Sequence, residues 1–306
     1  MLFSQFSWSS LLEQLINGLM SGSFYALVAL GYSMVYGVIK LLNFAHGDIY
    51  MTGAFVCLSS FTFVQKFLPG WPGIICAVVI AMCAAGLVGF LAQRFAYRPL
   101  LGAPRLSLLI TAIGVSLVIY NAAMILTKGR PMFFESNLNL AAGISIGPVN
   151  ITYAKIITFA ISISIMLALT LFIKRTMVGK AMRAIALDQD TCRLMGVNVN
   201  KIIALTFILG SALAAVAGGI FCINYGNLQY NMGYSIGIKA FTAAVIGGIG
   251  SIPGAMLGGI LLGLLESVGV MAFGSEWKDV FAFGILILML ILRPNGLLGK
   301  SEVERM

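Results

Sequence analysis

Charged side chains are scarce in this chain of 306 residues: 9% are Asp, Glu, Lys or Arg, and ten residues in all are acidic. Sixty per cent of the residues are hydrophobic, and the mean hydropathy is +1.00. No water-soluble core could bury this much apolar side chain. The sequence therefore excludes a soluble globular protein and predicts an integral membrane protein.

Histidine and cysteine are also too few for the sites they commonly build. The single His and five Cys show no metal-ligand spacing, and most of the Cys lie in apolar runs, so we expect no disulfide framework, metal site or cofactor. The net charge of +9 is spread in small groups between apolar runs, which indicates membrane topology and not nucleic-acid binding. No pairing of a nucleophile with a base stands out, so an enzyme is not expected.

A phosphate-binding loop is missing as well. The stretch 294–301, PNGLLGKS, has Pro294 where such a loop has its first glycine, and it follows an apolar helix instead of a strand. The chain is therefore not expected to bind ATP by that route.

Long apolar runs are abundant, and their length of about 20 residues favours membrane helices over ten-residue barrel strands. We expect an all-α polytopic protein that forms a single transmembrane domain over 1–306. The first apolar run is too long for a signal peptide and is expected to be a retained span. Eight or nine transmembrane helices are expected, depending on whether 43–64 crosses fully. The expected spans are 11–39, 43–64, 73–93, 106–127, 154–173, 202–223, 236–250, 252–273 and 277–292.

Lys and Arg mark one side of the membrane. Twelve of the nineteen lie in the segments 94–105 and 174–201 and in the tail 293–306, and an alternating path puts all three on one side. Because cytoplasmic loops are enriched in Lys and Arg, this side is predicted to be the cytoplasm. The polar loop 128–153 is then periplasmic, while the side of the N-terminus stays open.

The segment 174–201 is the one long polar stretch that predicts regular structure of its own. Residues 178–187 can form a short basic helix, Asp188 can cap a second helix, and Gly196 can end it in a left-handed conformation. Ala184, Ile185, Cys192 and Met195 would give these helices a surface for docking. The alternative is a solvated loop that only sets topology.

Polar residues interrupt the apolar pattern near 40–50, where a helix break is expected. Asn43, His46 and Asp48 lie within six residues of one another. Irregular backbone at membrane depth is tolerated where protein or a water-filled cavity surrounds it, and transporters often bind substrate at such breaks. The alternative is an interfacial turn in which Asn43 or Asp48 caps the next helix. We name all three as candidates for the translocation path.

Glu266 is a fourth candidate for the path, because it lies inside an apolar run. A carboxylate there must face protein or water and have a partner, such as Lys239 or an Asn or Tyr side chain. A proton relay through Glu266 and His46 is disfavoured, since relays normally contain more acidic residues. Gly250, Gly254 and Gly258 recur every four residues, which predicts close helix packing and, as the alternative, a movable gate.

Three segments carry a family resemblance: NGLMSGSFYALVALGYSMVYGVIKLLNFAHGDIYMTGAF at 17–55, GKAMRAIALDQDTCRLMGVNVNK at 179–201 and AAVIGGIGSIPGAMLGG at 243–259. In this order they resemble the permeases of branched-chain amino-acid ABC transporters, most closely the LivH-type subunit. The resemblance implies an ABC importer permease fold and import of leucine, isoleucine and valine across the bacterial inner membrane. Alternatives are a related permease for urea or short amides and an ATP-independent secondary transporter.

The resemblance also implies partners. These are a second, LivM-type permease that forms a heterodimer with this chain, two cytosolic ABC ATPases and a periplasmic amino-acid-binding protein. The segment 174–201 is similar to the EAA-type coupling loop that inserts into a groove on the ATPase, although it lacks the Glu-Ala-Ala triplet. Its expected coupling residues are Gly179, Arg183, Ala184, Asp188, Arg193 and Gly196.

Overall fold

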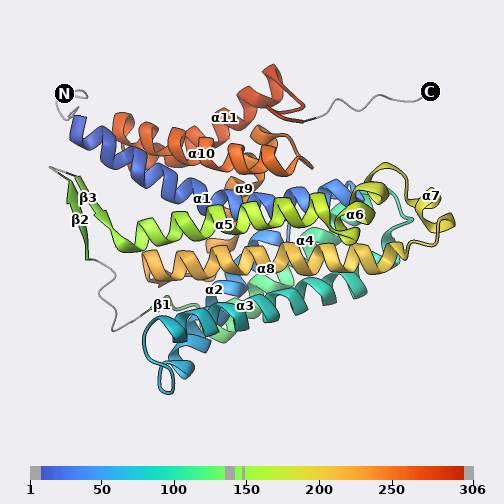
Figure 1. The fold of residues 1–306 in the computed structure, drawn as a ribbon, viewed down its shortest axis with the longest axis horizontal. Helices are drawn as coiled ribbons and strands as arrows, with labels where there is room; N and C mark the ends of the chain where they lie inside the picture. The colour runs from blue at the N-terminus through green and yellow to red at the C-terminus, as the bar shows by residue number, and fades with distance from the viewer. Residues whose placement is uncertain (1–7, 135–141, 147–148, 300–306) are drawn as a thin grey trace.

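The computed structural model describes residues 8–134, 142–146 and 149–299, so parts of the predicted periplasmic loop and of the tail lie outside it. The long helices are α1 (Trp8–Ile39), α2 (His46–Val64), α3 (Trp71–Leu91), α4 (Arg105–Thr127), α5 (Tyr153–Arg175), α8 (Val199–Tyr225), α9 (Met232–Gly247), α10 (Ile252–Phe273) and α11 (Lys278–Leu292). Two short helices, α6 (Met177–Leu187) and α7 (Gln189–Leu194), follow α5 (Figure 1). The fold is all-α, as predicted.

Minor elements connect the helices. A π-helical turn, η1 (Ala92–Tyr97), and a 3-10 turn, η2 (Arg98–Leu100), continue α3, and a 3-10 turn, η3 (Ser275–Trp277), precedes α11. Strand β1 (Met132–Phe133) pairs antiparallel with β4 (Asn227–Leu228), and β2 (Gly143–Ile146) with β3 (Val149–Thr152).

Seven of the described helices are long and apolar enough to cross a membrane: α1, α2, α3 with its extension, α4, α5, α8 and α10. The predicted span 43–64 is among them. The predicted spans 236–250 and 277–292 instead form the shorter helices α9 and α11, of 16 and 15 residues, so the full-length candidates number fewer than the eight or nine expected. Helix α9 stops early because Gly248 and Gly250 adopt φ values of 104° and 87°.

The basic segments gather at one end of the bundle. Strands β1 and β4 pair just after α4 and α8 finish, so those two helices end together, and their starts near 105 and 199 share the opposite end. Figure 1 places α6 and α7 at that opposite end as well. The N–H groups of Leu297 and Leu298 donate to carbonyl oxygens of Ile246 and Gly247, 2.9 Å away in each case. The described part of the tail therefore lies at the C-terminal end of α9.

The structure also places the start of α1, which the sequence left open. The Lys155 ammonium at the start of α5 donates to the Asn17 amide oxygen near the start of α1, at 2.7 Å. In Figure 1 α1 begins at the end where β2 and β3 lie. The start of α1 is thus on the same side as the predicted periplasmic loop.

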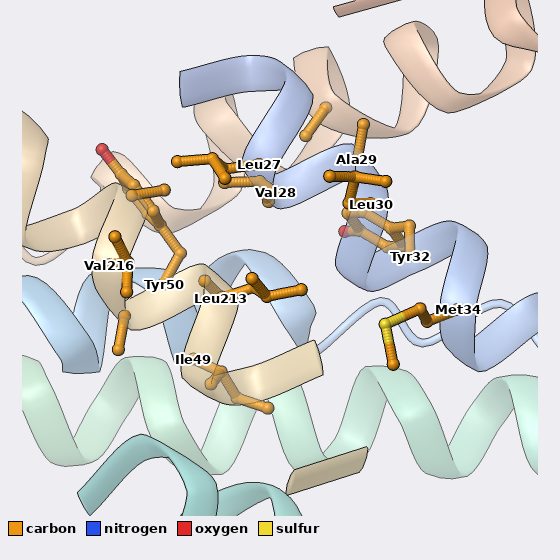
Figure 2. Packing of buried hydrophobic residues seen from close by; sticks show 14 of the residues in the cluster. Leu27, Val28, Ala29, Leu30, Tyr32, Met34, Ile49, Tyr50, Leu213 and Val216 are labelled. Carbon is orange, nitrogen blue, oxygen red and sulfur yellow. The ribbon is translucent and has the colours of Figure 1, made fainter. Parts of the chain in front are cut away.

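Helix α1 is central to the core because it is buried around most of its circumference from Gly18 to Val35. Figure 2 shows its side chains, such as Leu27 and Leu30, beside Ile49 of α2 and Leu213 of α8. On another face α1 crosses α10 closely: a Cβ added to Gly22 would lie 2.9 Å from the Gly259 carbonyl oxygen. Glycines permit this approach of the two backbones.

Candidate functional site

The helix break is confirmed, since α1 ends at Ile39 and α2 begins at His46. Lys40 turns the chain with a φ of 54°. The proposed alternative, in which Asn43 or Asp48 caps α2, is wrong, because Ala45 is the N-cap residue and no side chain caps this helix. Asn43, His46 and Asp48 are all buried within the protein.

Each polar residue of the break contacts a different helix. The Tyr97 hydroxyl of η1 donates to the Asn43 amide oxygen at 2.7 Å, and the Ser116 hydroxyl of α4 donates to the Asp48 carboxylate. The His46 ring meets the Tyr32 ring of α1 edge to face, with centroids 4.8 Å apart. The break is therefore a junction of α1, α2, α4 and η1.

Gly47 lets this junction also reach α9. A Cβ added at Gly47 would lie 2.3 Å from the Gly233 carbonyl oxygen and 2.7 Å from the Gly237 Cα. Gly233 in turn faces Asp48, whose carboxylate oxygen would be 2.7 Å from an added Cβ. Gly233 and Gly237 were not among the sequence candidates, although their four-residue spacing is the usual signal for close helix contact.

Glu266 lies in a network of charges in which it and Lys239 are buried. Its carboxylate accepts from the ammonium groups of Lys239 on α9 at 3.0 Å and Lys278 on α11 at 3.1 Å, and from the Tyr25 hydroxyl on α1 at 3.4 Å. Lys239 also pairs with Asp279 at 2.7 Å. Lys239 and Asn or Tyr side chains were the candidate partners, and the structure shows that Lys239 and a tyrosine contact Glu266.

The four path candidates thus form two groups. Asn43, His46 and Asp48 lie at the break, whereas Glu266 lies on α10, and no contact among the described residues joins it to the other three. Helix α9 touches both groups, because Gly233 and Gly237 meet the break and Lys239 meets Glu266.

A cavity of about 680 Å³ opens beside Glu266, at the end of the bundle opposite α6 and α7. Residues of α1, β3, α5, α8, α10, η3 and α11 line it. Its polar side chains include Asn17, Lys155, Asn224, Glu266 and Lys278, and its apolar ones include Met20, Ile223 and Val270. We refer to it below as the polar cavity. Its volume lies within the range of about 300–1,000 Å³ usual for sites of small ligands.

The two short helices expected in 174–201 are present. Thr176 caps α6, with its hydroxyl oxygen accepting from the Gly179 N–H at 3.1 Å, and Asp188 caps α7 by accepting from the N–H groups of Asp190 and Thr191. Gly196 follows α7 with a φ of 79°. These features confirm the predicted cap and the left-handed ending.

The carboxyl group of the Asp188 cap is ionised at neutral pH. The Thr191 hydroxyl, followed by the N–H groups of Thr191 and Asp190, lowers the pKa of the Asp188 carboxyl. Because this pKa is lower in the folded protein than in the unfolded chain, the cap stabilises α7 at pH values above about 4, the ordinary pKa of Asp. This stabilisation is lost as the pH falls through the lowered pKa.

Two of the expected coupling residues, Gly179 and Arg183, hold the corner between α5 and α6. The Arg183 guanidinium donates to the carbonyl oxygen of Ile173 at 3.0 Å, and an added Cβ on Gly179 would lie 2.2 Å from the same oxygen. Ala184 is exposed, and Arg193 is exposed and pairs with Asp190 at 3.0 Å. The contacts of Arg183 and Gly179 with Ile173 fix the direction in which α6 leaves α5.

Of the four expected docking residues, Ala184 and Met195 are exposed as predicted, and the other two are not. Ile185 and Cys192, named as docking residues, are buried against the rest of the chain. The exposed apolar side chains are those of Leu187, 89% exposed, Leu194, 88% exposed, and Met195 and Met177. We call these four residues the apolar tip. The apolar spacing in α6 and α7 does not predict which apolar side chains pack against the membrane helices and which stay exposed.

The glycines at 250, 254 and 258 do not form one ladder. An added Cβ on Gly254 would lie 2.3 Å from the Gly247 carbonyl oxygen, and one on Gly258 would lie 2.1 Å from that of Ala243, so both sit at the crossing of α10 and α9. Gly250 instead lies in the turn before α10, with a φ of 87°, and faces Gly37. Four-residue spacing does not reveal that the helix begins only after Gly250.

Residues 14–290 match the family described as the branched-chain amino acid transport system permease component. The chain belongs to this family. It is 46% identical over 309 residues to the permease protein BraD of the high-affinity branched-chain amino acid transport system of Pseudomonas aeruginosa, covering 96% of this chain and 97% of that one. It is 41% identical over 302 residues to the LivH permease protein of Escherichia coli, with the same two coverages.

A weaker likeness joins the permease to LivM of Escherichia coli, a permease protein of the same kind of system: 25% identity over 310 residues, covering 92% of this chain and 69% of LivM. Among solved structures, a metal-chelate type ABC transporter in an inward-facing conformation matches with a TM-score of 0.50 at 15% identity, covering 93% of this chain and 89% of that one. This likeness shows the ABC permease fold. The permease is a multi-pass membrane protein of the LivH type and not an enzyme.

Proposed function

We propose that the permease carries branched-chain amino acids across the bacterial inner membrane as one of two membrane subunits of an ABC importer. The observation that carries this proposal is the exposed apolar tip on and beside α6 and α7. Figure 1 shows these two helices at the basic end of the bundle. Several large apolar side chains exposed on one short polar segment are typical of a surface that a partner covers. A short amphipathic helix that enters a groove on an ATPase meets this need.

The partners are a second, LivM-type permease, two cytosolic ABC ATPases and a periplasmic amino-acid-binding protein. In this arrangement residues 1–306 form one transmembrane domain, 174–201 is its cytosolic coupling loop, 128–153 faces the periplasm and 293–306 is a cytosolic tail. The gathering of the basic segments at one end, with the start of α1 at the other, supports this orientation.

In the proposed mechanism, closure of the ATPases moves α6 and α7 against the membrane helices. The contacts of Arg183 and Gly179 with the end of α5 would transmit that motion as a rigid lever. The α2–α9 contact at Gly47 joins short α9 to the helix break, where Asn43, His46 and Asp48 would border the path. Rigid-body motion of this kind gives alternating access.

Uptake by proteoliposomes tests the substrate. With the permease, its partner permease, the ATPases and the binding protein reconstituted together, we expect ATP-dependent accumulation of labelled leucine and none of labelled urea. Accumulation of urea in place of leucine would support the alternative permease for short amides. Leucine uptake by the permease pair without ATPases would show an ATP-independent transporter and contradict the proposal.

A further inference from the structure

The polar cavity contains charges that the proposed motor coupling does not use. It lies at the strand-bearing end of the bundle, opposite the end that holds α6 and α7 in Figure 1, and Lys155, Glu266 and Lys278 line it together. In the proposed orientation this is the periplasmic end, where a substrate arrives.

Lys155 is placed to bind an anion. Its ammonium group donates to the neutral amide oxygen of Asn17 at 2.7 Å, and no carboxylate of the described residues pairs with it. Lys239, Lys278, Glu266 and Asp279 form a network of two cations and two anions. Lys155 therefore leaves the cavity with a positive charge in excess, which favours a ligand with a carboxylate.

Glu266 supplies the opposite charge in the same cavity. The side chain is 1% exposed, and its second oxygen, Oε2, has no hydrogen-bond partner among the described residues. A buried carboxylate oxygen without a donor is costly, so an incoming ammonium group would be favoured there. Lys278, which is half-exposed, pairs with the other oxygen, Oε1, at 3.1 Å and so leaves Oε2 without a donor.

Apolar side chains line the cavity together with these charges. Met20 of α1, Ile223 of α8 and Val270 of α10 all line it. Burial of an aliphatic side chain against them gains about 25 cal/mol per Å² of apolar surface. A carboxylate partner, an ammonium partner and an aliphatic surface together match an amino acid with an apolar side chain.

We infer that the polar cavity is a binding site for an aliphatic amino acid in its zwitterionic form, with Lys155 contacting the carboxylate and Glu266 the ammonium group. This inference rests on the proposed function, and it locates the first site within the membrane subunit that the substrate occupies.

Photoleucine, a leucine analogue with a diazirine in its side chain, tests the site directly. The assembled transporter in nanodiscs is illuminated with photoleucine, and labelled peptides are mapped by mass spectrometry. We expect labels on segments that contain Met20, Ile223 or Val270, and we expect excess leucine to remove them. Excess 3-methylbutylamine, which is leucine without its carboxylate, should compete at least tenfold less well.

Lys155→Met and Lys66→Met form the matched pair of variants. Lys66 is exposed and does not line the cavity. We expect Lys155→Met to reduce cavity labelling at least fivefold and to let 3-methylbutylamine compete as well as leucine, while Lys66→Met changes neither. A merely structural role of Lys155 would lower labelling without changing this selectivity, and that result would overturn the assignment of Lys155.

The absence of leucine-competed labels in the cavity would overturn the inference, whether labels appear elsewhere or nowhere. ATP-driven leucine uptake measured on the same preparation separates this failure from a failure of the proposed function. Uptake without cavity labelling contradicts only the cavity site, whereas a preparation that does not take up leucine contradicts the proposed function itself.

Discussion

Gly47→Ala is expected to destabilise the permease by about 2–3 kcal/mol, although it adds a single methyl group. The new Cβ would lie 2.3 Å from the Gly233 carbonyl oxygen and 2.7 Å from the Gly237 Cα. Both are backbone atoms, which no rotamer change can move away. Helices α2 and α9 must therefore separate, and the break that holds Asn43 and Asp48 shifts with them. The free energy of unfolding in mixed micelles, measured by denaturant titration, checks the value.

Gly114→Ala is the matched control for this prediction. Gly114 lies within α4, and a Cβ added there meets no heavy atom within 4 Å. Because Ala is about 1 kcal/mol more favourable than Gly inside a helix, the control should be neutral or slightly stabilised. Equal stabilities of the two variants would show that the α2–α9 contact is looser than the structure has it.

Glu266→Gln is expected to cost about 3–5 kcal/mol, because it removes the anion between two cations. The Lys239 ammonium, 3.0 Å from Glu266, is 7% exposed and would keep only Asp279 as a partner. The amide retains the size of the carboxyl, so the loss reports charge and not packing. Unfolding in the same micelles checks this expectation.

Lys239→Met, combined with Glu266→Gln, measures the interaction between these two side chains apart from their other contacts. If Lys239 and Glu266 stabilise one another, the double variant should lose at least about 1 kcal/mol less than the sum of the two single losses. Arg193→Gln removes an exposed ion pair on α7 and should change stability by less than about 1 kcal/mol. If the losses of stability for the Lys239 and Glu266 variants are additive, these two side chains do not stabilise one another, and the prediction is wrong.

The sequence predicted features that depend on local chemistry. The helix break follows from polar residues that interrupt an apolar run, and the Asp188 cap and the Gly196 ending follow from residue types with few other roles. That Glu266 has a partner was predictable, because a carboxylate within an apolar run needs one, but the sequence did not choose among Lys239 and the Asn and Tyr side chains and did not indicate Lys278.

Features that depend on packing between distant segments were not predictable. Ile185 and Cys192 were expected to dock on a partner, yet both are buried against the bundle. For Ile185 the direction of α6 matters, and it depends on the contact of Arg183 with the end of α5. The polar cavity joins Lys155 to Glu266 from separate helices, and no spacing in the sequence relates them. The short length of α9 depends on backbone angles at Gly248 and Gly250.

Leucine uptake tests most directly whether the apolar tip couples the permease to the ATPases. It is compared between transporters that carry Leu187→Glu with Leu194→Glu and transporters that carry Leu187→Met with Leu194→Met. Both side chains are almost fully exposed, so neither pair of changes should disturb the permease fold. If the apolar tip docks on the ATPases, the Glu pair should lower ATP-driven uptake at least tenfold and release the ATPases during purification, while the permease heterodimer stays intact. The Met pair should keep both properties. Uptake by the Glu pair equal to that of the Met pair would contradict coupling through α6 and α7.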